Sequence, residues 1–430
     1  MTYEVKEDFI LENGTLYDPV LDKKKQASIL ISKGVVKKVG NFSSNLKIKT
    51  IDCKGKLITP GFVDIHAHFR EPGREDKETL ETGSRAALSG GFTRVCVMPN
   101  TDPPLDSPES IRFIVEASKD LCVDIYPIAA ITKGQKGLEL TEIGEMVSAG
   151  AVAISDDGLP VQNGQVMRYA VEYANMFNIP VINHAEDICL RNDGVMNESA
   201  LSTSLGLSGN PSISESTMIY RDLEIAQFVN GKIHIPHVST SRSVEIIREF
   251  KSRGVSVTAE VTPHHIGLSE EKIINYDTNA KVAPPLRSDQ DRKMLIEGLK
   301  DGTIDCIATD HAPHTIEEKE MDFNHSPCGM IGLESAFGIA NTVLNDSGVS
   351  IEKVIKWFTL GPCSALGLDL MPFSINNKAE LCLIDPDYEW IFEESDILSR
   401  SKNSPMVGMK FKGKVVGVIS GKHSIGINLD

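Results

Sequence analysis

Short apolar runs alternate with longer amphipathic segments between residues 60 and 367. The apolar runs are residues 62–65, 93–98, 123–129, 151–154, 180–182, 232–235, 255–261 and 304–308. Segments with helical periodicity lie between them, at residues 77–88, 108–121, 165–177, 214–228, 243–250 and 289–299. Strand–helix alternation repeated eight times, with strands apolar on both faces, predicts an α/β fold of the (β/α)8, TIM-like barrel type. A doubly wound open sheet is the alternative, but it more often has a glycine-rich phosphate loop after its first strand, and none follows residues 62–65.

The two ends of the chain differ in character from the middle. Residues 1–59 contain short strand-like runs separated by turn residues and show no helical period. Three helix-like segments follow the eighth run, at 333–343, 351–358 and 362–366, and strand-like runs then return at 379–386 and 414–419. We therefore expect residues 1–59 and 368–430 to form one small β-sandwich beside a barrel of residues 60–367.

Charge and composition exclude several classes of protein. The 430 residues carry a formal net charge of −16, which argues against a nucleic-acid or anionic-membrane partner. The sequence has no run of about 18 apolar residues that could span a bilayer, and its first residues have no apolar signal core. Eight cysteines are present without a Cys-x-x-Cys pair, so we expect reduced thiols and a cytoplasmic protein.

The first apolar run of the barrel ends in His66-Ala67-His68-Phe69-Arg70. Side chains alternate along a strand, so His66 and His68 face the same way. Two neutral imidazoles on one face form half of a divalent metal site, and imidazole suits zinc. Arg70 adds a planar cationic group beside them that is suited to a carboxylate. The alternative is two surface histidines in a loop.

Further polar residues follow the other predicted strands, where a parallel barrel places its catalytic groups. They are Asn100, the pair Asp156 and Asp157, His184, His237, Asp310 and His314. Histidine and carboxylate ligands without thiolate suit one or two zinc ions, or manganese or cobalt in their place. Such a metal polarises a carbonyl and lowers the pKa of a bound water towards about 7. A neighbouring carboxylate can take the proton from that water and pass it to a leaving nitrogen.

These motifs together resemble the dihydroorotase family of the amidohydrolase superfamily. The resemblance covers nearly the whole chain and includes His-x-His-x-Arg at 66–70, Met-Pro-Asn at 98–100, Asp-Asp-Gly at 156–158, Asn-His-Ala-Glu at 183–186, His-Val-Ser at 237–239 and Asp-His-Ala-Pro-His at 310–314. The fourth strand end, residues 153–157, has no lysine, so the chain resembles the class that bridges its metals with an aspartate. That absence counts against hydantoinases, dihydropyrimidinases and the lysine-bridged dihydroorotases.

The resemblance implies a role for each candidate residue. His66, His68 and Asp310 would bind one zinc ion, His184 and His237 a second, and Asp157 would bridge them; strand alternation alone cannot choose Asp157 over Asp156. Asp310 would be the catalytic proton carrier. The residues implied in substrate binding are His68, Arg70, Asn100, His314, Cys328 and Gly329. The implied reaction is the reversible hydrolysis of (S)-dihydroorotate to N-carbamoyl-L-aspartate in de novo pyrimidine synthesis.

Two positions depart from the family pattern. Ala283 stands where an asparagine that contacts the substrate is common, and Cys328 where a phenylalanine is common. The enzymatic alternative is a related ring-opening amidase, such as an allantoinase or hydantoinase. A second alternative is a non-catalytic scaffold that assembles with aspartate transcarbamoylase, although such relatives usually lose metal ligands. A homodimer, and a complex with that transcarbamoylase, remain open as partners. The remaining histidines in these segments, His234, His264, His265 and His311, are interpreted as packed or hydrogen-bonded groups.

Overall fold

Eight parallel strand positions form a closed barrel in the computed structural model, which describes residues 2–5, 7–42 and 48–427. The strands are β9 (Phe62–Ala67), β10 (Phe92–Val97), β11 (Asp124–Pro127) continued by β12 (Ala129–Ala130), β13 (Ile154–Ser155), β14 (Val181–Ile182), β17 (Ile233–Ile235), β18 (Val257–Val261) and β19 (Cys306–Ile307). Every neighbouring pair is parallel. The ring closes where the His68 amide donates to the His311 carbonyl (2.8 Å), beside a parallel bridge from Ala67.

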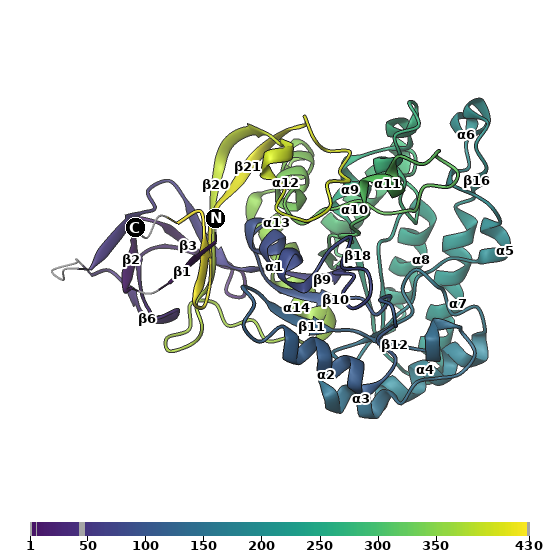
Figure 1. Ribbon diagram of the computed structural model, residues 1–430, viewed down its shortest axis with the longest axis horizontal. Coiled ribbons are helices and arrows are strands. Elements are labelled where there is room, and N and C mark those ends of the chain that lie inside the picture. The colour runs from purple at the N-terminus through teal and green to yellow at the C-terminus, as the bar shows by residue number, and fades with distance from the viewer. Residues whose placement is uncertain (1, 6, 43–47, 428–430) are drawn as a thin grey trace.

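Helices surround the barrel (Figure 1). The longer ones are α1 (Leu80–Ser89), α2 (Pro108–Ala117), α3 (Ile143–Ala149), α4 (Gly164–Met176), α7 (Ile213–Val229), α8 (Ser241–Ser252), α10 (Asp289–Asp301), α12 (Ala336–Asp346), α13 (Ile351–Phe358) and α14 (Leu360–Leu366). Local sequence explains their ends: Ser107 caps α2 through the amide of Ser110, with Pro108 in the first turn. In the described residues, no helix is both long enough and apolar enough to cross a bilayer.

Shorter elements lie in the loops above the carboxyl ends of the strands. They are α5 (Ile188–Arg191), α6 (Ala200–Leu205), α9 (Pro263–Gly267), α11 (Ile316–Lys319), the strand pair β15 (Met196–Asn197) and β16 (Gly209–Asn210), and 3₁₀ turns at Lys133–Gln135, Glu270–Ile273 and Thr278–Ala280. These loops enclose the site described below.

The two chain ends meet in two further sheets, seen as the purple and yellow strands on one side of Figure 1. One sheet has the order β1-β22-β21-β20-β8-β3-β4 and the other β6-β5-β2-β7. The strands are β1 (Thr2–Glu4), β2 (Phe9–Glu12), β3 (Thr15–Asp18), β4 (Lys23–Gln26), β5 (Ser28–Ser32), β6 (Val35–Gly40), β7 (Lys49–Asp52), β8 (Leu57–Pro60), β20 (Glu380–Ile391), β21 (Lys410–Ser420) and β22 (His423–Ile425). Phe9 and Ile31 from one sheet and Leu381 and Ile419 from the other share a buried apolar core. The β-rich terminal unit is therefore confirmed, and its boundaries at 59/60 and 367/368 stay a prediction.

The terminal unit also contacts the barrel loops. Strands β20 and β21 extend beyond the sandwich, and their far ends bury Trp390 and Phe411 against α12 and Met330. The segment between these strands carries Asn403, whose amide donates to the carbonyls of Ala312 (3.1 Å) and Gly329 (3.2 Å). A residue from the terminal unit thus holds two loops at the carboxyl ends of the barrel strands.

Candidate functional site

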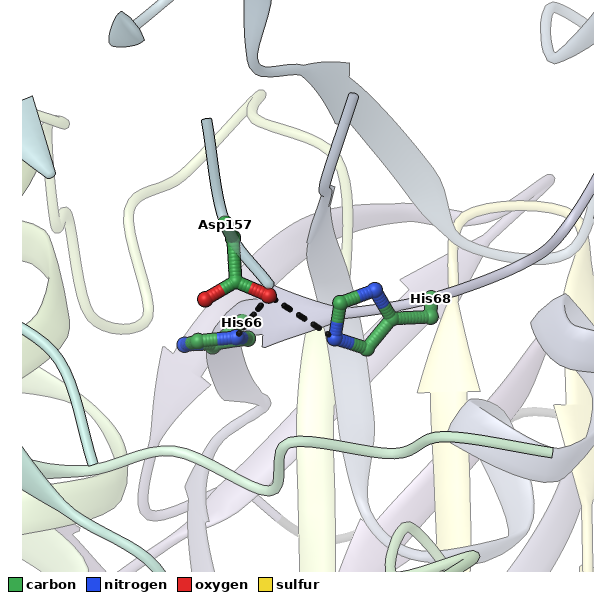
Figure 2. Close-up of side chains that lie close together, drawn as sticks. All are labelled: His66, His68 and Asp157. Atoms are coloured by element: carbon green, nitrogen blue, oxygen red, sulfur yellow. Dashed lines mark ion pairs between the residues drawn. The ribbon is translucent and has the colours of Figure 1, made fainter. Parts of the chain in front are cut away.

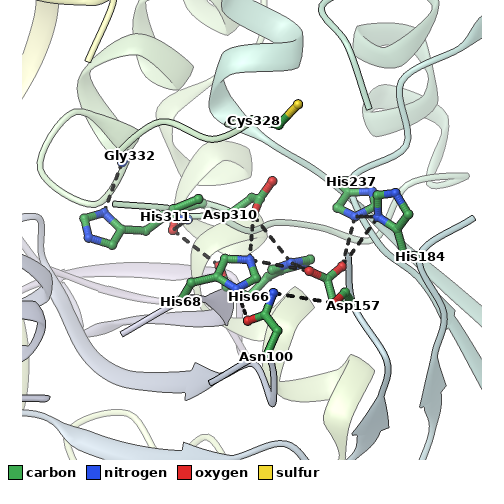
Figure 3. Close-up of polar contacts among 12 residues, drawn as sticks. His66, His68, Asn100, Asp157, His184, His237, Asp310, His311, Cys328 and Gly332 are labelled. Carbon is green, nitrogen blue, oxygen red and sulfur yellow. Dashed lines mark hydrogen bonds and ion pairs between the residues drawn. The ribbon is translucent and has the colours of Figure 1, made fainter. Parts of the chain in front are cut away.

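Asp157 lies between two pairs of histidines at the carboxyl end of the barrel (Figure 3), and Figure 2 shows it with the first pair, His66 and His68. Its Oδ2 is 3.6 Å from Nε2 of His66 and 3.5 Å from Nε2 of His68, both at the end of β9. Its Oδ1 is 3.6 Å from Nδ1 of His184 and 3.3 Å from Nε2 of His237, which follow β14 and β17. One carboxylate therefore presents one oxygen to each histidine pair.

Asp310, which follows β19, completes the first half of this cluster. Its Oδ1 lies 3.0 Å from Nε2 of His68 and 3.6 Å from Nε2 of His66. The six side chains predicted as metal ligands are all buried, and the fold brings them together from five strand ends. The six side chains therefore lie close together, as the sequence predicts. Their binding of metal stays a prediction.

The cluster fits divalent cations by its donor atoms and its charge. Nε2 of His66 is fully buried and has no hydrogen-bond partner among the described residues, although it points at two carboxylates. Burial lowers the pKa of His66, but the charges of Asp157 and Glu260 outweigh it and hold that pKa well above its usual value. Hydrogen bonds to Asp157 and Glu186 likewise overcome burial and raise the pKa of His184 to about 10. Histidine binds metal in its neutral form, so the carboxylates around these rings leave an excess of negative charge. A bound zinc or similar divalent ion would balance that charge.

The neighbouring carboxylate, Asp156, points elsewhere. It accepts hydrogen bonds from the backbone amides of Ile131 (2.8 Å) and Thr132 (3.1 Å), and from the Thr132 hydroxyl. Burial raises the pKa of Asp156 to about 6. Of the two adjacent carboxylates, only Asp157 thus enters the histidine cluster.

Three residues of the site adopt a left-handed backbone conformation, which is uncommon for residues other than glycine. Arg70, His237 and Asp310 have φ of 61°, 33° and 47°. Each follows the end of a barrel strand, and the left-handed conformation turns the chain sharply at that point. Strain of this kind persists only where surrounding contacts hold it, and it is concentrated at functional sites.

A cavity of about 440 Å³ opens above the cluster. Its walls include the residues predicted to bind substrate: His68, Arg70, Asn100, His314, Cys328 and Gly329. Ala283, the departure from the family pattern, also lines it, as do Arg191, Asn210 and Ser326. The cavity therefore offers three cationic side chains, those of Arg70, Arg191 and Lys281, and several neutral polar groups around the proposed metal ligands.

Arg70 and His314 supply different kinds of donor to this cavity. Burial lowers the pKa of Arg70 to about 10, so its guanidinium stays charged at neutral pH. Burial, assisted by the charges of Arg70 and Lys77, lowers the pKa of His314 to about 3, so its ring is neutral. Its Nε2–H donates to the Cys328 carbonyl (2.8 Å), and its Nδ1 lies 3.2 Å from the Lys77 ammonium and 3.0 Å from the Glu318 carboxylate, which pair with each other.

The other histidines largely make the structural contacts expected of them. His265 bonds the Thr262 hydroxyl (2.8 Å) and the Pro284 carbonyl (3.0 Å), and His311 contacts Glu78 (3.3 Å). His234, Glu260 and Cys306 lie close enough together to suggest a further metal site. Each of the three already has a partner in the structure: His234 contacts Glu260 at 3.0 Å, and the Cys306 thiol lies 3.9 Å from the Ala259 carbonyl.

Three polar residues contact the proposed site residues but are not predicted by the pattern of polar residues at strand ends. Glu260 lies inside β18 and contacts Nδ1 of His66 at 2.6 Å. Glu186 lies 3.7 Å from Nε2 of His184. Lys77 holds His314, as described above. A sequence signal exists for Glu260, because a carboxylate in the middle of an apolar strand is buried and needs a partner.

Comparisons with known proteins agree with this geometry. Residues 55–243 match a family model described as dihydro-orotase-like. The dihydroorotase of Pelotomaculum thermopropionicum is 46% identical over 406 residues, which are 94% of this chain and 95% of the relative. That of Acetivibrio thermocellus is 44% identical over 408 residues, which are 94% of this chain and 96% of the relative.

Solved structures confirm the predicted barrel with a β-rich terminal unit. The L-hydantoinase (dihydropyrimidinase) of Arthrobacter aurescens superposes with a TM-score of 0.85 at 25% identity, covering 96% of this chain and 95% of that one. A D-hydantoinase superposes with a TM-score of 0.83 at 22% identity, covering 97% and 94%, a likeness of fold alone.

Proposed function

The chain belongs to the dihydroorotase family, and we propose that its barrel-end site interconverts (S)-dihydroorotate and N-carbamoyl-L-aspartate with the help of zinc. The activity places the protein among the cyclic amidohydrolases and in pyrimidine biosynthesis. The observation that carries the proposal is the division of the two Asp157 oxygens between two histidine pairs, beneath a cavity that also presents Arg70.

Six side chains would hold the metal. The first zinc position is proposed at His66, His68 and Asp310, and the second at His184 and His237, with Asp157 shared between them. When bound, zinc polarises the ring amide carbonyl and makes a water acidic enough to attack it near neutral pH. One or two ions per chain are consistent with the two ligand groups that share Asp157.

Asp310 is proposed as the proton carrier. Its carboxylate lines the cavity beside His68, and the charge of His66 outweighs burial to keep its pKa below the usual value. In the ionised form it accepts the proton that water loses as the new C–O bond forms at the ring carbonyl. It then gives that proton to the ring nitrogen as the C–N bond breaks, which yields the carbamoyl amide and a carboxylic acid that releases the second water proton to solvent. Ring closure follows the same steps in reverse.

Arg70, Asn100 and His314 are proposed to hold the carboxylate that dihydroorotate carries outside its reacting amide. A charged guanidinium with two parallel donors matches a carboxylate in shape and charge. Hydantoin and allantoin lack that carboxylate, so Arg70 favours dihydroorotate over both. The backbone of Cys328 and Gly329 would lie along the ring.

The proposal is tested by metal analysis together with assays on dihydroorotate, hydantoin and allantoin. We expect one or two zinc equivalents, turnover of dihydroorotate alone, loss of turnover after chelation and recovery on adding zinc. Turnover of only the two neutral rings would contradict the choice of substrate, and full activity without metal would contradict the metal site.

Two further proposals concern the cellular location of the protein and its oligomeric state. We propose a cytoplasmic enzyme, supported by eight cysteines that are all free thiols. A homodimer is proposed on the exposed apolar side chains of α4 and α7, which include Met176 (76% exposed) and Phe228 (75% exposed). Light scattering of the protein alone, and after mixing with aspartate transcarbamoylase, distinguishes a monomer, a dimer and a mixed complex.

A further inference from the structure

Glu260 is a buried carboxylate at the centre of the barrel, directly beneath the histidine cluster. It is 1% exposed and lies in β18, which pairs with β19 in the barrel. A charge in this environment is costly unless it is fully paired, so both of its oxygens require partners.

Its two oxygens contact three groups. Oε1 lies 2.6 Å from Nδ1 of His66 and accepts the backbone N–H of His237 at 3.4 Å. Oε2 lies 3.0 Å from Nε2 of His234, whose Nδ1 contacts the Thr258 hydroxyl at 2.8 Å. Glu260 therefore touches one ligand from each half of the proposed metal site and is itself held from below by His234.

These contacts determine which nitrogen of His66 carries the proton. An ionised carboxylate can only accept, so Nδ1 of His66 must donate to Glu260. In the neutral ring, Nε2 then has a free lone pair, and Nε2 is the atom that points at Asp157 and Asp310. The same Oε1 also holds the amide of His237, whose backbone has a positive φ of 33°.

We propose that Glu260 is a positioning residue, which fixes His66 with its proton on Nδ1 and its Nε2 towards the metal position, and which steadies the turn that presents His237. This inference rests on the proposed metal site. Carboxylates that orient metal-binding histidines in this way typically change metal affinity 10–100-fold when replaced. His234 serves as the anchor that keeps the carboxylate aligned.

The test compares zinc affinity, measured by competition with a chromophoric chelator, in the wild type, E260Q and E215Q. Glu215 is an equally buried carboxylate in α7 that accepts from the amides of Ser239 and Thr240 and contacts no proposed ligand. We expect E260Q to bind zinc roughly 10–100-fold more weakly, and E215Q to bind it as the wild type does. Equal affinity in E260Q and the wild type would overturn the inference alone, whereas a wild type without zinc would overturn the proposed metal site as well.

A second measurement does not depend on how E260Q folds. Histidine ¹⁵N shifts of the zinc-loaded wild type, with His66 assigned by comparison with H66Q, report which ring nitrogen carries hydrogen. We expect His66 to be protonated at Nδ1 and unprotonated at Nε2. The opposite tautomer, or a deprotonated Nδ1, would overturn the proposal.

Discussion

Asn100 and His68 are joined by a hydrogen bond of 2.7 Å between the amide oxygen and Nδ1 of the ring. Because that oxygen can only accept, Nδ1 of His68 carries the proton, and its Nε2 is left for Asp310 and Asp157. The residue predicted to contact substrate therefore also orients a proposed metal ligand. Its amide nitrogen faces the Asp157 carbonyl at 3.5 Å, and the side chain still lines the cavity.

Replacing Asn100 by alanine should impair two properties at once. Loss of the acceptor frees the His68 ring, so we expect zinc affinity to fall by about tenfold, and loss of the cavity-facing amide should raise KM for dihydroorotate. Chelator competition and steady-state kinetics at saturating zinc separate the two effects. The control is T101A, whose hydroxyl donates to the neighbouring loop carbonyls of Pro99 and Pro103. A higher KM with unchanged zinc affinity would show that Asn100 acts on substrate alone.

Asp310 to asparagine should reduce kcat by about 10²–10⁴-fold, the usual contribution of a positioned acid–base group. The amide keeps the size of the side chain, so the fold is expected to persist. The matched control is D305N. Asp305 lies directly before β19, at the other end of the strand from Asp310, and pairs with Lys251. Circular dichroism checks the fold, and zinc content shows whether the loss arises in the chemical step. Turnover within threefold of the wild type would exclude Asp310 as the proton carrier.

Sequence pattern predicted the barrel and placed the proposed ligands at the ends of its strands, because both depend on local order. Eight apolar runs identify the strands, and polar residues at their carboxyl ends necessarily meet at one rim. This reasoning cannot choose between Asp156 and Asp157. Both follow the end of the strand, where side chains no longer alternate regularly between its two faces. The structure separates them by the amides of Ile131 and Thr132, which come from the neighbouring strand end.

Contacts between distant segments account for what pattern alone did not predict. Glu260 meets His66 across the barrel, 194 positions away in the chain. Asn403 comes from the terminal unit and holds loops that belong to the barrel. Neither pairing has a local signature, because each depends on how the finished barrel closes and on how the two units pack.

Lys281 is expected to control the loop that carries Cys328 and Gly329. The residue is 3% exposed, and its ammonium donates to the carbonyls of Phe323 (2.6 Å), Asn324 (3.0 Å) and Ser326 (2.7 Å). K281M leaves these carbonyls without their donor, at a cost of about 1–3 kcal/mol for an unpaired buried group. The loop should therefore lose order, which is expected to raise KM more than it lowers kcat.

Hydrogen exchange of residues 323–329 and steady-state kinetics measure these two effects of K281M. The control is K300M, because Lys300 is partly exposed in α10 and, among the described residues, pairs only with Glu297. Unchanged exchange in this loop in K281M would contradict the role assigned to Lys281.

His265 should make the fold sensitive to acid. Burial lowers its pKa from 6.5 to about 3, and the neutral ring donates from Nε2 to Pro284 and accepts at Nδ1 from Thr262. The unfolded chain takes up a proton near pH 6.5 that the folded chain does not, so this residue's contribution to stability is complete above that pH. It is lost as the pH falls, at about 1.4 kcal/mol per pH unit, down to the folded pKa.

The H265Q variant should therefore lose less stability between pH 7.5 and pH 5.0 than the wild type, by about 2 kcal/mol. Urea unfolding at the two pH values measures the difference, whatever the absolute stability of the variant. H325Q is the control, because His325 is exposed and contacts only Asp322 through its side chain, and it should keep the wild-type dependence. If H265Q and the wild type lost equal stability over this range, the His265 ring would have to accept a proton within the fold, and its Nδ1 could not be held as an acceptor by the Thr262 hydroxyl.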